Sequence, residues 1–301
     1  MSEVNAPEPA EGSGAPAVST PSSVALAGVL GWPVRHSRSP VMHNAAFAAL
    51  GLPWRYLALP VRAELFAETA RALPLSGYRG ANVTLPHKEA ALRLADVAGS
   101  AARAAGAANT LTFTGDGAIE ADNTDVGGFL DALGTPPRGL RALILGAGGS
   151  ARAVAVGLRD AGAADVAVWN RSAERAAALA EGLGVRHARD PRRELDDAAL
   201  LVNATSVGLQ DDPGGEAALE MLGLAGAQAP ETVVDLVYGV EPTPVVRWAS
   251  LAGARVVDGL EVLVRQGARS FEIWTGRPPP VGVMRDAARD SLRRPSGAPE
   301  P

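Results

Sequence analysis

Short apolar runs alternate with longer, alanine-rich segments from residue 24 onward. The runs "VALAGVLG" (24–31), "YLALP" (56–60) and "GANVTL" (80–85) predict strands, and residues 40–50 predict a helix. When helices separate consecutive strands, the strands pair in parallel, because each helix runs back along the sheet to the end at which the preceding strand began. The pattern therefore predicts an α/β fold with a mainly parallel sheet.

The same alternation resumes after a turn-rich connector, "GTPPRGL" (134–140). Residues 141–172 predict a strand, a glycine-rich turn, a helix and a second strand within about 30 residues, the length of a Rossmann βαβ unit. We expect further strands at 199–208, 231–239 and 254–259. From residue 260 the residues follow the 3.6-residue spacing of a helix, and we expect this helix to end at Gly276. The chain thus predicts two α/β domains.

Composition narrows the class of protein. The chain has 301 residues, of which 47% are hydrophobic, and no cysteine, so disulfides and thiolate zinc sites are excluded. A net charge of −5 argues against general nucleic-acid binding, and no apolar run reaches the roughly 20 residues of a membrane span. His36 and His43 lack a third ligand nearby, so we expect no metal site. We expect a cytoplasmic protein.

Both ends of the chain differ from this pattern. Residues 1–23 and 293–301 are rich in Pro, Ala, Ser, Gly and Glu and have no apolar periodicity. Residues 1–23 also lack the basic start and apolar stretch of a signal peptide. We expect both segments to be disordered tails.

Position 88 holds a lysine, and the other 27 of the 28 Lys and Arg residues are arginine. Either residue serves surface charge, but only lysine loses its proton readily when its surroundings demand it. Chance placement of one lysine is the plain alternative. We expect Lys88 to transfer a proton or to provide a compact ammonium group that arginine cannot imitate.

The segment "GAGGSA" (146–151) has the G-x-G-x-x-A form of a dinucleotide-binding loop. It follows a predicted strand and opens a predicted helix, which is the required context. Gly146 permits the tight turn, Gly148 lets a pyrophosphate approach the backbone, and Ala151 allows close helix packing. Free N–H groups at the helix start attract the phosphates.

The next strand ends in "WNRSAER". An NAD site commonly has Asp or Glu at this strand end to bind the ribose hydroxyls. Here Asn170, Arg171 and Ser172 occupy it, and Arg175 follows one helical turn later. Two guanidinium groups suit the additional 2′-phosphate of NADP, because arginine binds phosphate through several donors. This favours NADP over NAD, against the alternative of a solvated helix start.

Two further segments hold polar groups. Ser39 precedes Pro40, which predicts Ser39 as a helix N-cap, and Ser37 adds a second hydroxyl suited to binding a carboxylate. In "ADNTDVGGF", any of Asp122, Asn123 and Asp125 could cap the next helix.

The segments "SRSP", "NVTLPHK", "AANT", "DNTD", "GAGGSAR", "NRS", "NATSVG" and "DGLEVLVRQ" occur in the order, and at nearly the spacing, found in shikimate dehydrogenases. From about residue 24 to about residue 290 the chain resembles this family. His87 departs from the aromatic or aliphatic residue common there, but its neighbours match. The resemblance implies the NADPH-dependent, reversible reduction of 3-dehydroshikimate to shikimate, in the pathway to aromatic amino acids.

The resemblance also implies a domain division and a set of roles. A substrate domain of residues 24–124 plus 266–292 and an NADP-binding Rossmann domain of residues 125–265 would flank a cleft. Lys88 and Asp125 match the catalytic pair. The implied substrate-binding residues are Ser37, Ser39, Thr84 and Tyr238 on the carboxylate side, and Asn82, Lys88, Asn109, Asp125 and Gln266 on the hydroxyl side. The implied cofactor-binding residues are Gly146, Ala147, Gly148, Gly149, Ser150, Asn170, Arg171, Ser172, Arg175, Thr205 and Gly259.

Two alternatives remain at this point. A catabolic quinate/shikimate dehydrogenase shares nearly all these segments, although its NAD-using members tend to carry an acidic residue near the ribose. A non-catalytic paralogue that binds a shikimate-like ligand could dispense with Lys88 or Asp125, yet this chain has both. We expect a monomer or a homodimer.

Overall fold

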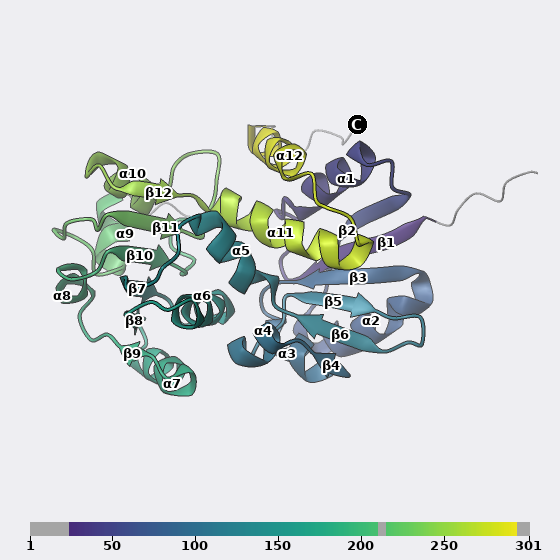
Figure 1. Ribbon diagram of the computed structural model, residues 1–301, viewed down its shortest axis with the longest axis horizontal. Helices are drawn as coiled ribbons and strands as arrows, with labels where there is room; N and C mark the ends of the chain where they lie inside the picture. Colours follow the sequence, from purple (N-terminus) through teal and green to yellow (C-terminus); the bar gives the residue numbers. More distant parts are fainter. Residues whose placement is uncertain (1–23, 210–214, 294–301) are drawn as a thin grey trace, which may run out of the picture.

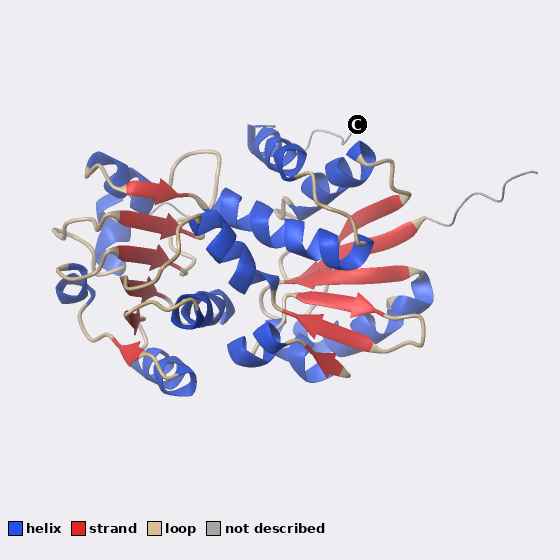
Figure 2. Ribbon diagram, viewed as in Figure 1, coloured by secondary structure: helices blue, strands red, loops and turns tan. Residues whose placement is uncertain are grey.

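The computed structural model describes residues 24–209 and 215–293, so both predicted tails lie outside the described residues, apart from Arg293. Two six-stranded sheets form the framework (Figure 2). The strands of the first sheet are β1 (Ala25–Gly31), β2 (Trp54–Pro60), β3 (Tyr78–Val83), β4 (Val97–Ala98), β5 (Thr110–Phe113) and β6 (Ile119–Asp122). Those of the second are β7 (Arg141–Leu145), β8 (Asp165–Trp169), β9 (Arg186–His187), β10 (Leu200–Asn203), β11 (Thr232–Asp235) and β12 (Arg255–Val257).

Helices connect and cover these strands. The α-helices are α1 (Ser39–Ala49), α2 (Phe66–Ala72), α3 (Lys88–Leu94), α4 (Ser100–Ala105), α5 (Thr124–Leu133), α6 (Gly149–Asp160), α7 (Ala173–Leu183), α8 (Pro191–Leu195), α9 (Gly215–Met221), α10 (Pro244–Leu251), α11 (Gly259–Thr275) and α12 (Val281–Arg293). Short 3₁₀ turns, η1 (Ala63–Leu65) and η2 (Pro74–Ser76), flank α2.

The strand orders confirm the predicted α/β class. The second sheet has the order β12-β11-β10-β7-β8-β9 and all its pairs are parallel, which is the doubly wound arrangement of a Rossmann fold. The first sheet has the order β2-β1-β3-β5-β6-β4, and β1 is parallel to both neighbours. However, β5 pairs antiparallel with β3 and with β6, a hairpin that the sequence analysis did not predict.

Alternate side chains of the central strands pack against helices on opposite faces. In β7, Leu143 and Leu145 contact the cluster beneath α8, α9 and α10, whereas Ala142 and Ile144 contact the cluster beneath α5, α6 and α7. The first sheet is similarly covered by α2, α3 and α4 on one face and by α1, α11 and α12 on the other. Each half is therefore a three-layer sandwich with a two-sided apolar core.

Two helices, α5 and α11, lie side by side between the sheets (Figure 1). A Cβ at Gly128 of α5 would lie 2.5 Å from the backbone of Gln266, so only glycine permits this close packing. Near the C-terminal end of α11, Trp274 lies over Gly80 of β3 and donates a hydrogen bond to the Leu111 carbonyl at 3.0 Å. The chain leaves the first half through α5 and returns through α11, which fixes the two halves to each other.

The predicted domain boundaries at residues 125 and 266 fall inside α5 and α11, so they divide two continuous helices. The domain division stays a prediction. Three of the predicted strands are shorter than expected: residues 204–208, 236–239 and 258–259 lie beyond β10, β11 and β12. These polar and glycine-containing residues follow the carboxyl ends of parallel strands, where Rossmann folds place their binding loops.

One edge of the first sheet is covered by a side chain. Within the described part of the chain, β2 has a strand partner on one side only. On the other side, Asn44 of α1 accepts a hydrogen bond from the Tyr56 N–H at 2.8 Å and donates one to the Tyr56 carbonyl at 3.0 Å. The amide thus replaces a neighbouring strand for one residue and fixes α1 along the edge.

Among the described residues, no helix combines the length and the apolar character needed to cross a bilayer.

Candidate active site

Lys88 and Asp125 form an ion pair where the two halves meet. Lys88 opens α3 in the first half, and its Nζ lies 2.6 Å from Asp125 Oδ2. Nζ also lies 3.4 Å from Ser150 Oγ, and the side chain packs against Gly149, whose Cβ, if present, would lie 3.3 Å from Lys88 Cδ. The pair is thus directly beside the glycine-rich loop, and both side chains stay partly accessible, at 11% and 18%.

Asp125 can face Lys88 because another residue caps its helix. Asn123 is the N-cap of α5, and its Oδ1 accepts from the backbone N–H groups of Asp125 and Val126. The sequence left Asp122, Asn123 and Asp125 as equal candidates for this cap. Since Asn123 takes that role, neither carboxylate oxygen of Asp125 is needed to cap the helix. Oδ2 pairs with Lys88, and Oδ1 accepts from Asn109 Nδ2 at 2.8 Å.

Asn109 and Gln266 extend the site toward α11. Asn109 Nδ2 also lies 3.2 Å from Gln266 Oε1, and Asn109 Oδ1 accepts from the Thr124 N–H at 2.7 Å. Both side chains are almost wholly buried. These bonds fix the orientation of the Asn109 amide, and its Nδ2 group holds Asp125 in line with Lys88.

A hydroxyl cluster, defined as Thr110, Thr124 and Ser270, lies beneath these amides and was missed by the sequence analysis. Its three oxygens lie 2.9–3.1 Å from one another. Asn82 Nδ2 donates to Ser270 Oγ at 2.8 Å, and Asn82 Oδ1 accepts from the Tyr56 hydroxyl at 2.8 Å. The sequence held one signal of this cluster: Ser270 follows Gln266 by four residues and therefore lies on the same face of the predicted helix.

Ser37 and Ser39 lie together at the start of α1, but the predicted cap was wrong. The N-cap is Arg38, and α1 begins at Ser39 without a side-chain cap. Instead, Ser37 Oγ accepts from the Ser39 N–H at 3.3 Å. Arg38 itself adopts helical dihedral angles, which moves the boundary by one residue and leaves the Ser39 hydroxyl to contact the Tyr56 hydroxyl. Burial raises the pKa of Tyr56 well above its usual value, so Tyr56 remains a neutral donor.

Tyr238 reaches this region from the second half. It follows β11, packs against the apolar cluster around α1 and α11, and its hydroxyl lies near the backbone of Arg38. Burial raises its pKa. Thr84 lies at the end of β3, where its methyl group would meet any Cβ at Gly31. Tyr238 thus lies near Arg38, the residue between Ser37 and Ser39.

The glycine-rich loop has the geometry that a dinucleotide requires. Gly146 has φ +117°, and a Cβ there would lie 2.8 Å from the Ala204 carbonyl oxygen. Gly148 is the N-cap of α6, and the space where its Cβ would stand is open. The first N–H groups of α6 are therefore accessible next to Ala147 and Ser150, as pyrophosphate binding needs.

The end of β8 presents two arginines. Ser172 caps α7 by accepting from the Arg175 N–H, and Asn170 Nδ2 donates to the Ser172 carbonyl. The side chains of Arg171 and Arg175 are exposed, and neither makes an ion pair with the described residues. Both guanidinium groups are available for a phosphate.

Two other predicted cofactor residues have internal partners. Thr205 N–H and Oγ1 both donate to Asn203 Oδ1, at 3.1 and 2.7 Å. A Cβ at Gly259 would lie 2.4 Å from the Leu236 carbonyl oxygen, so this glycine allows α11 to begin against the loop that follows β11.

The histidines do not form a metal centre. His43 is wholly buried and stacks on Tyr56 with ring centroids 4.3 Å apart, and burial lowers its pKa to about 3. His36 lies beside Arg35 on the surface. Within residues 24–209 and 215–293, no group of three or more His, Asp or Glu side chains is arranged to hold a metal ion.

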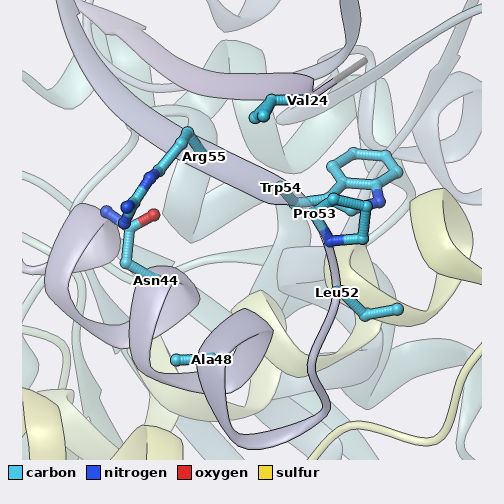
Figure 3. Close-up of a pocket in the computed structure, with 7 residues that line it drawn as sticks. All are labelled: Val24, Asn44, Ala48, Leu52, Pro53, Trp54 and Arg55. Carbon is cyan, nitrogen blue, oxygen red and sulfur yellow. The ribbon is translucent and has the colours of Figure 1, made fainter. Parts of the chain in front are cut away.

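A cavity of about 230 Å³ lies elsewhere, between α1 and the start of β2 (Figure 3). Its lining is mostly apolar and includes Trp54 and Leu52. Its one amide, Asn44, is already bonded to the strand edge. None of the predicted site residues lines this cavity.

The second half has a Rossmann fold with a loop suited to binding phosphate, and a lysine–carboxylate pair lies beside that loop. These features define the class of this protein, a two-lobed α/β oxidoreductase. Family models agree along the chain. The shikimate dehydrogenase substrate binding domain matches residues 29–111, shikimate / quinate 5-dehydrogenase matches 135–208, and the shikimate 5'-dehydrogenase C-terminal domain matches 259–289.

Individual proteins give the same result. A shikimate dehydrogenase (NADP(+)) from Paracoccus denitrificans (strain Pd 1222) is 42% identical over 286 residues, which cover 91% of this chain and 96% of that one. One from Acidiphilium cryptum (strain JF-5) is 46% identical, covering 89% and 97%. The crystal structure of the Thermus thermophilus shikimate 5-dehydrogenase with NADP(H) and shikimate aligns with a TM-score of 0.78 at 41% identity, covering 89% and 100%. The chain belongs to the shikimate dehydrogenase family.

Proposed function

We propose that this protein catalyses the reversible, NADPH-dependent reduction of 3-dehydroshikimate to shikimate, as a biosynthetic enzyme of the cytoplasm. The observation that carries the proposal is the Lys88–Asp125 ion pair lying against Gly149 of the dinucleotide loop. This arrangement supports the proposal because a dinucleotide bound at this loop would lie beside a proton donor. Relatives over nearly the whole chain bear the name shikimate dehydrogenase (NADP(+)).

The residues of the second half fit NADPH, which supplies the hydride when bound. Gly146, Gly148 and the start of α6 provide backbone N–H groups for the pyrophosphate. Arg171 and Arg175 are exposed and suited to the 2′-phosphate, which NAD lacks. The absence of an acidic residue at Asn170 supports the same choice.

Lys88 deals with the charge that develops during reduction. When hydride reaches the carbonyl carbon, the carbonyl oxygen becomes negative and needs a proton or a neighbouring cation. The Lys88 ammonium provides either, and Asp125 holds it in position at 2.6 Å. In the reverse direction, Lys88 receives the proton from the shikimate hydroxyl.

The remaining polar side chains orient the substrate. Ser37, Ser39 and Thr84, with Tyr238 from the second half, form the proposed carboxylate site. Asn82, Asn109 and Gln266 form the proposed hydroxyl site. The internal hydrogen bonds of these amides support this role, because preorganised groups lose little freedom when substrate binds.

A quinate dehydrogenase is the competing function. Quinate carries an additional hydroxyl beside its carboxylate, which a site shaped for the flatter shikimate ring would leave buried and unpaired at a cost of about 1–3 kcal/mol. The arginines at the β8 end support NADP and therefore the biosynthetic direction. We further propose a monomer or a homodimer.

The test is a steady-state assay that follows reduced nicotinamide with four pairings, shikimate or quinate with NADP or NAD. We expect kcat/KM for shikimate with NADP to exceed that for quinate with NAD by at least about 100-fold. Comparable values for the two pairings would contradict the biosynthetic assignment in favour of the quinate alternative. No turnover with any pairing would support a non-catalytic paralogue.

A further inference from the structure

A second polar cluster lies wholly inside the Rossmann half, at the ends of two neighbouring strands. We define the strand-end clamp as Asn203, Asp235 and Thr243. Asn203 ends β10, Asp235 ends β11, and both side chains are 0% exposed. Asn203 Nδ2 donates to Asp235 Oδ1 at 2.9 Å, and Thr243 Oγ1 donates to Asp235 Oδ2 at 2.5 Å.

The clamp fixes two loops at once. Asp235 Oδ1 accepts from the Val237 N–H at 3.0 Å, so one carboxylate binds both ends of the loop 236–243. Thr243 Oγ1 accepts from the Val246 N–H at the start of α10. Asn203 Oδ1 accepts twice from Thr205, which begins the loop after β10.

An apolar strand end would serve the fold alone as well. Burying a carboxylate without a cation is costly, and replacing buried polar groups by apolar ones of similar shape is often neutral for stability. No Lys or Arg within the described ranges pairs with Asp235; its partners are an amide, a hydroxyl and a backbone N–H. The arrangement therefore points to a requirement for placement of the loop.

The loop 236–243 carries Tyr238, which we assign to the carboxylate side of the substrate. Tyr238 packs on the apolar cluster of the first half, and its hydroxyl lies near the backbone of Arg38, between Ser37 and Ser39. The opposite side of the loop lies against Gly259, where no larger residue fits. The clamp and α11 thus hold the base of the loop while Tyr238 contacts the proposed carboxylate site.

We propose that Asn203, Asp235 and Thr243 are positioning residues for the reaction. By fixing the loop 236–243 they place the Tyr238 hydroxyl at the carboxylate of the substrate, and so determine substrate affinity more than the rate of hydride transfer. None of the three touches the substrate in this arrangement. The inference rests on the proposed function for the identity of that substrate.

The test compares Thr243→Val with Thr243→Ser. Valine keeps the shape but removes the hydroxyl, and we expect KM for shikimate to rise by about tenfold while kcat and KM for NADP change by less than about threefold. Serine keeps the hydroxyl and should stay within about twofold of the wild type. Asp190→Ala is the matched control, because it removes the N-cap of α8 in the same half and leaves the loop untouched.

Hydrogen exchange gives a second measurement that needs no turnover. In the ligand-free protein, Thr243→Val and Asp235→Asn should both speed amide exchange across residues 236–243, whereas Asp190→Ala should not. If the wild type fails to oxidise shikimate but the loop exchanges as expected, the clamp stands and the substrate assignment fails. If Thr243→Val lowers the melting temperature as Asp190→Ala does, with KM for shikimate and loop exchange unchanged, the clamp is only structural and the proposal is overturned.

Discussion

Asp125 and Asp235 are two aspartates at the ends of secondary-structure elements, and their surroundings are opposite. Asp125 keeps 18% of its side-chain surface and faces the Lys88 ammonium, where the halves meet. Asp235 is sealed within one half and, among the described residues, faces neutral donors. The catalytic role that we propose for Asp125 needs a charged partner with solvent nearby, whereas neutral donors sealed from solvent make the Asp235 carboxylate a fixed anchor.

Replacing Lys88, the charged partner of Asp125, should give the largest effect, a loss of catalytic rate. Lys88→Ala should lower kcat by about 10²- to 10⁴-fold, the range for loss of a general acid/base, with a smaller change in KM. Lys88→Arg should restore little, because a guanidinium group is wider and does not release its proton. Steady-state kinetics measure both.

Arg93→Ala is the matched control, because Arg93 is an exposed cation on the same helix, paired with Glu89 one turn before it. It should leave kcat near the wild-type value. A Lys88→Arg variant that keeps most of the wild-type kcat would refute proton transfer by Lys88.

Replacing Asp235, the aspartate sealed from solvent, should change how the free energy of unfolding depends on pH. Burial raises the pKa of Asp235 to about 6, whereas an unfolded aspartate titrates near ~3.9. Between these values the native protein retains a proton that the unfolded chain has released, so the free energy of unfolding falls as pH rises. Asp235→Asn removes this dependence, and its stability relative to the wild type should increase by up to about 3 kcal/mol from pH ~4 to ~6.5, then level off.

Urea unfolding at a series of pH values measures this difference. Asp190→Asn is the control, since Asp190 lies half exposed at a helix start and asparagine is an equally good N-cap. A stability difference for Asp235→Asn that stays constant with pH would show that Asp235 is already ionised at acid pH.

Arg171 and Arg175 extend the comparison to charged groups without an opposite charge nearby, because neither has a carboxylate partner among the described residues. Replacing both by alanine should weaken NADP binding by about 2 kcal/mol, or roughly thirtyfold in KM, and leave NAD nearly unchanged. Arg192→Ala with Arg193→Ala removes the same charge from α8 and should affect neither cofactor. Equal losses for NADP and NAD in the first variant would mean that these arginines support the fold.

Much of the framework could be predicted because it depends on local patterns. β1, the dinucleotide loop and the end of α11 at Gly276, with φ +62°, were all predicted from the sequence. The hairpin β5–β6 was missed, although β10 and β11 also have four residues and were predicted. β10 and β11 lie in the apolar runs "LLV" and "TVV", whereas β5 and β6, "TLTF" and "IEAD", place a polar residue at every second position, and their pairing depends on contacts with β3.

The polar networks could be predicted only in part. The lone lysine pointed to Lys88 and the resemblance supplied its partner Asp125, but the pattern "DNTD" left three candidate caps, and the pairing of Asp125 with Lys88 is a contact distant in sequence. Asp235 gave a weak signal, a single carboxylate at the end of the apolar run "TVVD". Its partner Thr243 follows eight residues later, and nothing in the sequence shows that the intervening loop folds back.

Asn44 has a consequence beyond the position of α1. An open strand edge invites strands from other molecules to join it, which is a common route to aggregation. Because the Asn44 amide occupies both backbone groups of Tyr56, an incoming strand would have to break two formed hydrogen bonds at the third residue of β2 before its own ladder could continue. A single side chain thereby limits strand addition along an edge of seven residues.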